Sequence, residues 1–310
     1  MPLPDPLIIG TRGSPLALTQ TGMVRDALAA RHPGVVIETS RISTRGDRVQ
    51  DRPLADIGGK ALFIAEIEAE LRSGLIHLAV HSGKDMPSDM PDDMLIAAFL
   101  PRADPRDVLV SSVATTLDAL PSGARVGTSS PRRAAQLRAR RQDLEILDIR
   151  GNVDTRLGKL DAGSFDALIL AAAGLIRLGL SHRIAGYIPA DEMIPCAAQG
   201  AIAIEVAVGN DDVLRAVSAL NHESTARAVI AERAFLAAVG GSCDTPLGAH
   251  AYLEGDDLIL HAVIASASGQ CVHGKRRGHA SMATALGEAL AEQLMANGGA
   301  ELLNGVSGTA

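Results

Sequence analysis

The sequence predicts an α/β protein with two doubly wound domains around a cleft and a smaller α+β domain at the C-terminal end. Short apolar runs typical of buried strands alternate with amphipathic helical patterns through residue 200. A charged segment with two prolines at 101–107 interrupts the alternation, and the apolar run at 201–207 is expected to return the chain to its first half. Two such crossings are typical of paired domains that close on a ligand. The predicted domains are 1–100 with 201–218, then 101–200, and then 219–310.

The composition of the chain limits the classes of partner. Of its 310 residues, 47% are hydrophobic and 21% are charged, as in ordinary globular proteins. A formal net charge of −7, with no Trp, two Tyr and four Phe, disfavours nucleic acid and anionic membranes as partners. Three widely spaced cysteines fit reduced thiols better than a disulfide framework. Because no segment has the pattern of a signal peptide or a spanning helix, we expect a cytoplasmic protein.

The first domain is predicted to open with a strand, a tight turn and a helix. Leu7–Thr11 is an apolar run, and Leu16–Arg31 has helical spacing, with Ser14 as the expected N-cap. Arg12 falls at the carboxyl end of the strand, where open α/β sheets bind ligands, although a solvated surface arginine is an equal alternative. The other elements expected here are strands at 35–44, 78–82 and 95–100 and a helix at 62–72.

Two polar segments of this domain are candidate ligand sites. The glycines before Lys60 free the backbone N–H groups of the next helix for an anion, although the spacing is not that of a Walker loop. Lys84 and Asp85 lie side by side directly after the strand 78–82. They are either a plain surface pair or part of the ligand-binding edge of the sheet.

The second domain is predicted to carry a cluster of arginines. Strands are expected at 108–112, 124–129, 144–149 and 165–171. Arginines in the first turn of a helix oppose the helix dipole, which favours ligand binding over helix stability at residues 132 and 133. An acidic protein that gathers guanidinium groups on one rim suits a ligand with several carboxylates or phosphates. The arginines at or just past strand ends are Arg132, Arg133, Arg150, Arg156 and Arg177 of this domain, together with Arg12 of the first domain.

The third domain is predicted to display a cysteine on a turn. A helix is expected at 221–239, and the turn at 240–248 contains Cys243 between glycines and a proline. Taken alone, this composition is more typical of a helix C-cap and turn than of a reactive thiol. We expect a hairpin of strands at 247–253 and 258–265, a helix at 283–297 and a disordered tail at 306–310.

A series of motifs runs along the chain in a fixed order. They are Arg12 to Leu18, Thr44 to Asp47, Gly58 to Lys60, His81 to Pro87, Gly127 to Arg133, Arg150 to Asn152, and Gly240 to Gly248. In this order they resemble the porphobilinogen deaminase family, and the likeness covers nearly the whole chain. The resemblance implies two periplasmic-binding-protein-like domains and a C-terminal domain that carries the cofactor.

The resemblance also implies an activity. The family is expected to be a monomeric, cytoplasmic transferase of tetrapyrrole biosynthesis, without a metal, that joins four porphobilinogen units on a covalent dipyrromethane cofactor and releases hydroxymethylbilane. By similarity, Cys243 holds the cofactor as a thioether, and Asp85 is catalytic, because its carboxylate accepts pyrrole N–H groups and stabilises developing positive charge. The cofactor-binding residues implied are Cys243, Asp85, Lys84, Thr128, Ser129, Ser130, Arg132, Arg133 and Arg156, and the substrate-binding residues are Arg12, Ser14, Lys60, Arg150, Arg156, Arg177 and Gln199.

One alternative and four departures accompany this interpretation. A non-catalytic anion-binding protein of the periplasmic-receptor type has similar paired domains, but it predicts a signal peptide and no covalent group. Asp56, Gly83, Pro131 and Ser242 differ from the common bacterial pattern of the family. Among these, Asp56 alone removes an expected chemical group, a cation near the loop of Lys60.

Overall fold

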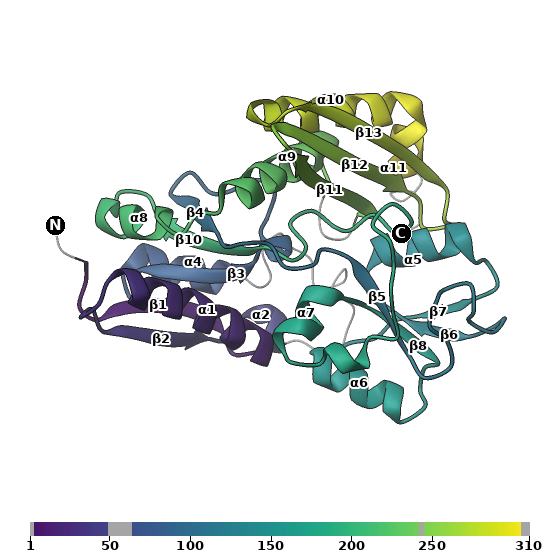
Figure 1. The fold of residues 1–310 in the computed structure, drawn as a ribbon, viewed down its shortest axis with the longest axis horizontal. Coiled ribbons are helices and arrows are strands. Elements are labelled where there is room, and N and C mark those ends of the chain that lie inside the picture. The colour runs from purple at the N-terminus through teal and green to yellow at the C-terminus, as the bar shows by residue number, and fades with distance from the viewer. Residues whose placement is uncertain (1–2, 49–63, 242–244, 305–310) are drawn as a thin grey trace. The chain divides into compact units, whose positions relative to one another are not determined.

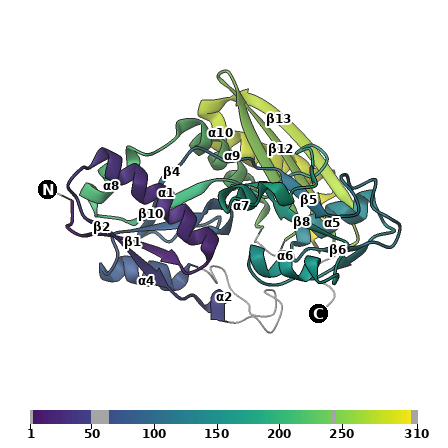
Figure 2. The same cartoon turned by 60° about the horizontal axis from the view of Figure 1, so that its bottom comes forward.

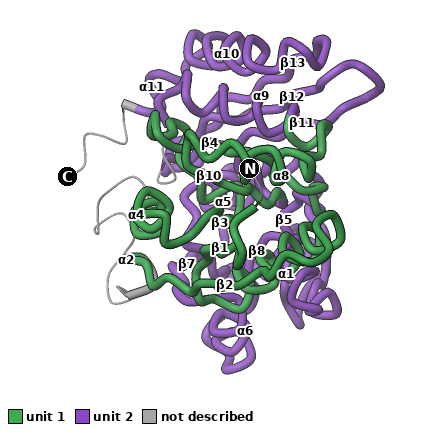
Figure 3. The backbone as a smooth tube through the Cα atoms, turned by 90° about the vertical axis from the view of Figure 1, so that its left-hand side faces the viewer, with its two compact units in different colours: residues 1–103, 201–226 green, residues 104–200, 227–310 purple. Residues whose placement is uncertain are grey.

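The computed structural model describes residues 3–48, 64–241 and 245–304 as sheets flanked by helices (Figure 1). The chain divides into two compact units, residues 1–103 with 201–226 and residues 104–200 with 227–310 (Figure 3). The predicted α/β class, with two doubly wound sheets and a smaller C-terminal α+β part, is confirmed. The three-domain division of the chain stays a prediction.

The first unit contains a mixed sheet of order β2-β1-β3-β10-β4. β1 is parallel to β2 and β3, whereas β10 is antiparallel to both of its neighbours. β10 comes after the second sheet in the chain and still lies between β3 and β4, so the first sheet is complete only when the chain returns. The strands are β1 (Leu7–Arg12), β2 (Ile37–Ile42), β3 (Leu78–Ser82), β4 (Met94–Phe99) and β10 (Ile202–Ala207).

Helices cover both faces of this sheet (Figure 2). Alternate residues of a strand point to opposite faces, so Leu78 and Val80 pack with α1 and α8, while Ala79 packs with α4. The expected N-cap is confirmed, since the Ser14 hydroxyl accepts the Ala17 N–H at 3.2 Å. The helices are α1 (Pro15–Arg31), α2 (Arg45–Arg48), α4 (Ala65–Ser73), α8 (Asp211–Ser218) and a 3₁₀ turn, Gly83–Asp85.

The second unit begins with a sheet of order β7-β6-β8-β5-β9. β6 is parallel to β7 and β8, and β5 is antiparallel to β8 and β9. α5 packs on one face, and α6 and α7 pack on the other. The elements are β5 (Asp107–Ser111), β6 (Arg125–Gly127), α5 (Pro131–Arg140), β7 (Glu145–Leu147), α6 (Val153–Asp161), β8 (Ala167–Ala171), α7 (Ala172–Arg177), a 3₁₀ turn (Ser181–Arg183) and β9 (Gly186–Tyr187).

The C-terminal part of this unit is an antiparallel sheet of order β11-β12-β13, with helices packed on one face (Figure 1). The predicted hairpin is present, and β13 extends it with a strand that the sequence pattern did not indicate. The helix predicted at 283–297 is present as α10 but ends three residues early, and a wide turn at Met295–Gly299, in which Gly298 has a φ of +103°, leads to a further short helix, α11. The elements are α9 (Glu223–Val239), β11 (Leu247–Glu254), β12 (Asp257–Ala265), β13 (Cys271–His279), a 3₁₀ turn (Ala280–Met282), α10 (Ala283–Leu294) and α11 (Ala300–Asn304).

Two further expectations concern the tail and membrane-spanning helices. The predicted tail at 306–310 lies outside the described residues. Throughout the described ranges, every helix is too short or too polar to span a bilayer.

Candidate active site

Arg12, Ser14, Lys84 and Asp85 line one pocket of about 100 Å³ in the first unit. Arg12 is the last residue of β1, and Ser14 caps α1. The 3₁₀ turn after β3 supplies the lysine and the aspartate. β1 and β3 are parallel neighbours, so their carboxyl ends meet at one edge of the sheet, where α/β proteins bind ligands. The sequence therefore predicted these four residues at one place, and the structure brings them together.

The same pocket has walls to which sequence reasoning gave no role. Gln20 of α1 is buried, and its side-chain amide exchanges hydrogen bonds of 3.0 Å with the Ser82 hydroxyl. His81 lines the pocket from β3, and Ile64 closes the side before α4. The motif from His81 to Pro87 contained the signal for the histidine, but no local pattern links Gln20 to Ser82, 62 residues away.

A buried pair formed by a histidine and a glutamate adjoins this pocket. The imidazole of His81 is 2.9 Å from Glu205 of β10, measured from Nε2 to Oε2, and both side chains are almost fully buried. Among the described residues, the second Glu205 oxygen, Oε1, has no hydrogen-bond partner. Glu68 of α4 is nearby, and its pKa is raised by burial and by the negative charge of Glu205. The one carboxylate in the otherwise apolar strand 202–207 is the sequence feature that indicates such a buried polar pair.

The second group of predicted residues begins at the N-terminus of α5. The Ser130 side chain caps the helix by accepting the Arg133 N–H at 3.5 Å, and the Thr128 hydroxyl accepts the Ser130 N–H at 3.2 Å. Pro131 departs from the family pattern, but it occupies the first helical position, where a fixed φ and a missing N–H cost nothing. Ser129 and Ser130 remain partly exposed at this end of the helix.

Arg132 and Arg133 are buried rather than displayed. The Arg132 Nη1 donates to Asp107 Oδ2 at 2.7 Å, and Arg133 donates from Nε and Nη2 to Asp107 Oδ1 at 3.0 and 2.8 Å. Asp107 is the first residue of β5 and is 0% exposed. The boundary between the two units, after Ala103, falls within the predicted segment 101–107, but Asp107 at its end belongs to the buried start of β5. The two arginines are explained by their ion pairs with Asp107 rather than by helix stability, and their contact with a ligand stays a prediction.

Gln199 supports the same buried network. Its side-chain nitrogen donates to the Pro105 carbonyl at 2.7 Å and to Asp107 Oδ1 at 2.9 Å. Burial alone would raise the pKa of Asp107, but the charges of Arg132 and Arg133 outweigh this effect and hold it far below its usual range. The carboxylate is therefore ionised throughout the neutral range. The predicted substrate contact of Gln199 stays a prediction.

Arg156 and Arg177 are half-buried cations whose hydrogen bonds go to neutral oxygens. Arg156 donates to the Gly151 carbonyl at 2.9 Å and to the Ser129 hydroxyl at 3.5 Å. Burial and then the charge of Arg133 lower the pKa of Arg156 to about 10. Arg177 donates to the Gly200 carbonyl at 2.7 Å, and burial lowers the pKa of Arg177 to about 10. Both sites would gain from a ligand anion.

The remaining predicted residues are placed as follows. Arg150 is half-buried three residues past the end of β7, and its positive charge contributes to the lowered pKa of Arg156. Cys243 and Lys60, with the departures at 56 and 242, lie outside the described residues. The helix before the cysteine ends as predicted, because Gly240 has a φ of +73° and the Gly241 N–H donates to the Leu236 carbonyl at 3.0 Å.

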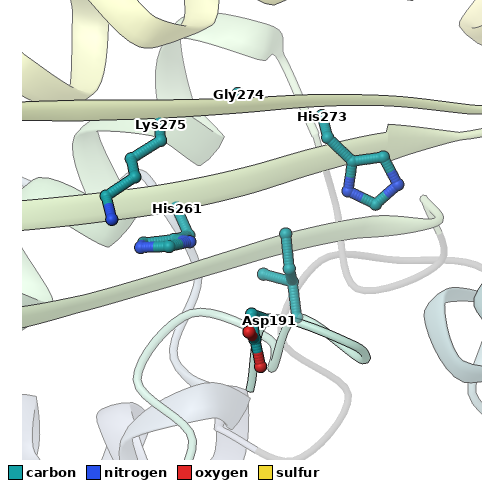
Figure 4. Close-up of a pocket in the computed structure, with 6 residues that line it drawn as sticks. Asp191, His261, His273, Gly274 and Lys275 are labelled. Carbon is teal, nitrogen blue, oxygen red and sulfur yellow. The ribbon is translucent and has the colours of Figure 1, made fainter. Parts of the chain in front are cut away.

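A larger pocket of about 450 Å³ in the second unit contains none of the predicted residues. Figure 4 shows His261 and Lys275 on adjacent strands and Asp191 on the loop that faces them. Burial lowers the pKa of His261 and also the pKa of His273, which favours neutral imidazoles. In the part of the chain that the structure describes, no group of three or more His, Cys, Asp or Glu residues is arranged to hold a metal ion.

Family models and sequence relatives match nearly the whole chain, and all of those described below are porphobilinogen deaminases. Residues 7–215 match the family model described as porphobilinogen deaminase, dipyromethane cofactor binding domain, and residues 226–296 match the model of the porphobilinogen deaminase C-terminal domain. The porphobilinogen deaminase of Roseiflexus castenholzii is 54% identical over 299 residues, which cover 96% of this chain and 99% of that protein. The porphobilinogen deaminase of Xanthomonas axonopodis pv. citri is 48% identical over 298 residues, with coverage of 96% and 98%.

Solved structures of substrate-binding proteins are similar at a lower level. The second substrate-binding domain of Lactococcus lactis GlnP has a TM-score of 0.43 and 13% identity, and the match covers 77% of this chain and 93% of that one. A periplasmic substrate-binding protein from Coxiella burnetii has a TM-score of 0.42 and 17% identity, with coverage of 69% and 91%. The family models and the sequence relatives decide the assignment. This chain belongs to the porphobilinogen deaminase family, whose members are transferases with a dipyrromethane cofactor.

Proposed function

We propose that the chain condenses four porphobilinogen units stepwise on a dipyrromethane cofactor attached to Cys243, then releases hydroxymethylbilane by hydrolysis for tetrapyrrole biosynthesis. The observation that carries the proposal is the pocket in which Asp85 lies with Arg12, Ser14 and Lys84. One carboxylate among cations and a hydroxyl suits a substrate that carries both carboxylates and a ring N–H.

Asp85 is proposed to act on the reacting ring. A carboxylate has two oxygens, so it accepts hydrogen bonds from two pyrrole N–H groups and holds the rings in reach of each other. As the amino group leaves, positive charge develops on the ring, and the fixed negative charge of Asp85 stabilises it. Arg12 and Lys84 bind the acetate and propionate groups from the same pocket, so the ring is oriented before the C–N bond breaks.

The arginines of the second unit are proposed to hold the other carboxylates. Arg156 and Arg177 are half-buried, and within the described ranges their hydrogen bonds involve no carboxylate and the Arg177 Nε has no partner. These groups fit a ligand that brings several anions, which dipyrromethane does through its acetate and propionate groups. When bound, the cofactor supplies the primer to which the pyrroles are added. The residues proposed for this binding are Thr128, Ser129, Ser130, Arg132, Arg133, Arg150, Arg156 and Arg177, with Lys60 and Gln199 for the substrate.

Cys243 is proposed as an anchor and not as the nucleophile of each cycle. The thioether forms once in each protein molecule, so an adjacent carboxylate, Asp244, which disfavours the thiolate, does not limit turnover. We further propose that the protein is a cytoplasmic monomer, on the basis of the three widely spaced cysteines and the family resemblance.

Intact mass and product formation together test the function. We expect wild-type protein, expressed in a host that supplies the primer, to exceed the mass of the bare chain by one dipyrromethane. Asp85→Asn should keep this added mass but lose about 10²–10³-fold in product formation, because the fixed charge is lost while the cofactor attachment remains. Cys243→Ser should have the bare mass. Asp92→Asn, on an exposed residue, is the matched control and should behave like wild type.

The outcomes separate the parts of the proposal. Near-normal turnover of Asp85→Asn would remove Asp85 from the catalytic role. A bare wild-type mass would contradict the attachment and favour a non-catalytic anion-binding protein. An added mass that persists in Cys243→Ser would place the attachment at another residue.

A further inference from the structure

We propose that His81 and Glu205 form a proton-accepting pair for the pocket of Asp85, with His81 as the base and Glu205 as the residue that positions it. The inference rests on the proposed function, because each condensation releases a proton in this pocket. Nothing in the family match assigns a role to either residue.

The position of Glu205 demands an explanation. β10 reads Ile-Ala-Ile-Glu-Val-Ala, and its first five residues are all buried, the glutamate included. A carboxylate in such a strand is costly, and an apolar residue of similar size is often neutral or stabilising in its place. Structural needs alone therefore do not favour a glutamate here. Buried, charge-paired groups beside a pocket are typical of functional sites.

The sheet register sets the geometry of the pair. β3 and β10 are antiparallel, with His81 opposite Ala203 and Glu205 opposite Ala79, so both side chains stand on the same face of the sheet. An ionised carboxylate only accepts hydrogen bonds, so His81 donates through Nε2 and keeps the lone pair on Nδ1. The ring lines the pocket of Asp85. A carboxylate that fixes the tautomer of a histidine also stabilises the imidazolium that forms when the ring takes a proton.

The groups around the pair provide a route for the proton. Glu68 and Arg72 face it from α4, and Lys84 and Asp85 face it from the pocket. Oε1 of Glu68 and Oε1 of Glu205 are both buried without a partner among the described residues. The pKa of Glu68 is raised, so this carboxyl takes up a proton more readily than an ordinary glutamate. Arg72 is exposed and contacts Glu68 at 3.4 Å, so the cluster reaches solvent through this arginine.

The proton balance of one condensation defines the step. The C–N bond of the incoming porphobilinogen breaks, and its electron pair leaves with ammonia. A new C–C bond forms at the unsubstituted carbon of the neighbouring ring, the C–H bond there breaks, and its electron pair returns to the ring. The proton passes to the free nitrogen of His81, and Glu205 offsets the imidazolium charge. Proton and ammonia leave as ammonium, so no oxidant or reductant is required. Asp85 stays ionised and stabilises the cation.

Two measurements on the full-length, cofactor-loaded protein test the pair. The first is the pH dependence of product formation. Glu205→Gln should lower the maximal rate by about tenfold and move the acid limb to lower pH, because His81 loses the charge that favours its protonated form. His81→Gln should lower the rate by about 10²-fold and remove that limb. Glu70→Gln, a partly exposed residue on α4, is the matched control and should leave the profile unchanged.

The second measurement does not depend on activity. In ¹⁵N NMR of the histidine rings, the signals of His81 are those missing from His81→Gln. We expect the proton on Nε2 in wild type and a titration at lower pH in Glu205→Gln. An unchanged titration and an unchanged acid limb in Glu205→Gln would overturn the inference, even if the variant were less stable. A wild-type protein that makes no hydroxymethylbilane would overturn the proposed function instead, and the ring titration would still report on the pair.

Discussion

At the scale of single residues, the carboxylate of Asp107 organises the arginine cluster of the second unit. Arg132 and Arg133 lie in the first turn of α5, where the helix dipole opposes positive charge. Asp107 accepts hydrogen bonds from both arginines and from Gln199. This buried negative charge explains why the sequence tolerates arginines at an unfavourable position.

Removal of the Asp107 charge should destabilise the protein strongly. Asp107→Asn leaves two buried guanidinium groups without a counter-charge, which we expect to cost about 3–5 kcal/mol in the free energy of unfolding. Urea unfolding monitored by circular dichroism measures this loss. Asp118→Asn is the control, because it breaks an exposed pair with Arg140 and should cost about 0–1 kcal/mol. Equal losses in the two variants would contradict the assigned role.

The stability that Asp107 contributes through Arg132 and Arg133 should depend on pH in a direction set by the lowered pKa of Asp107. The folded protein holds the carboxyl ionised below its ordinary pKa of about 3.9, so the contribution is complete above that value. It is lost only as the pH falls toward the lower pKa of the folded state. The difference between wild type and Asp107→Asn should therefore be constant from about pH 5 to 8 and shrink in stronger acid. A difference that grows toward acid pH would contradict the pairing.

Site residues could be predicted from the sequence where they follow a recognisable local pattern, such as an apolar strand. Arg12, Lys84 and Asp85 follow apolar runs, and the ends of parallel strands meet at one edge, so their neighbourhood could be predicted. Asp107 could not, because a charge among prolines is typical of a linker and its partners lie 25 residues and more along the chain. Pairs such as that of His81 and Glu205 depend on which strands become neighbours, a choice that local periodicity does not contain.

At the scale of elements, the clearest predictions were those with strong periodicity. The strand at 78–82 is confirmed as β3, and the helix at 16–31 is confirmed as α1. β13 was missed because its less exposed face carries Val272, Gly274, Arg276 and Gly278, and these residues give no alternation of apolar and polar side chains. α8 was missed because eight residues between two turns give too short a pattern for a period of 3.6.

The packing of α10 on α9 depends on Gly287. A Cβ at this position would lie 2.4 Å from the Ala231 carbonyl oxygen and 2.8 Å from the Ala234 Cβ. Gly287→Ala therefore forces the two helices apart, and we expect a cost of about 1–3 kcal/mol despite the better helix propensity of alanine. Gly158→Ala in α6 is the matched control, since a Cβ there meets nothing within 4 Å. This control should be stabilised by about 0.4–1 kcal/mol. Chemical unfolding of both variants measures the change in the free energy of unfolding. An unchanged value for Gly287→Ala would contradict the prediction, because it would show that α9 and α10 can move apart without loss of stability.

At the scale of the whole molecule, the net charge of the chain is negative, whereas the second unit gathers positively charged arginines. The chain carries a net charge of −7, yet the second unit holds two half-buried guanidinium groups, Arg156 and Arg177, whose hydrogen bonds within the described residues go to no carboxylate. The pKa values of Arg156 and Arg177, each lowered to about 10, express the cost of these charges at neutral pH. A bound polyanion would remove that cost while the negative surface keeps non-specific anions away.

Cofactor loading should therefore stabilise the folded protein. If dipyrromethane carboxylates reach these arginines, the loaded wild type should exceed Cys243→Ser by about 2 kcal/mol in the free energy of unfolding, or about 3 °C in Tm for a chain of this size. Cys271→Ser, at a half-buried cysteine, is the matched control and should load and melt like wild type. Added citrate should raise the Tm of Cys243→Ser more than that of wild type, because free carboxylates then occupy the vacant guanidinium groups. Equal melting temperatures with an equal citrate response would show that the arginines gain nothing from the cofactor. Differential scanning calorimetry of the three proteins measures both effects.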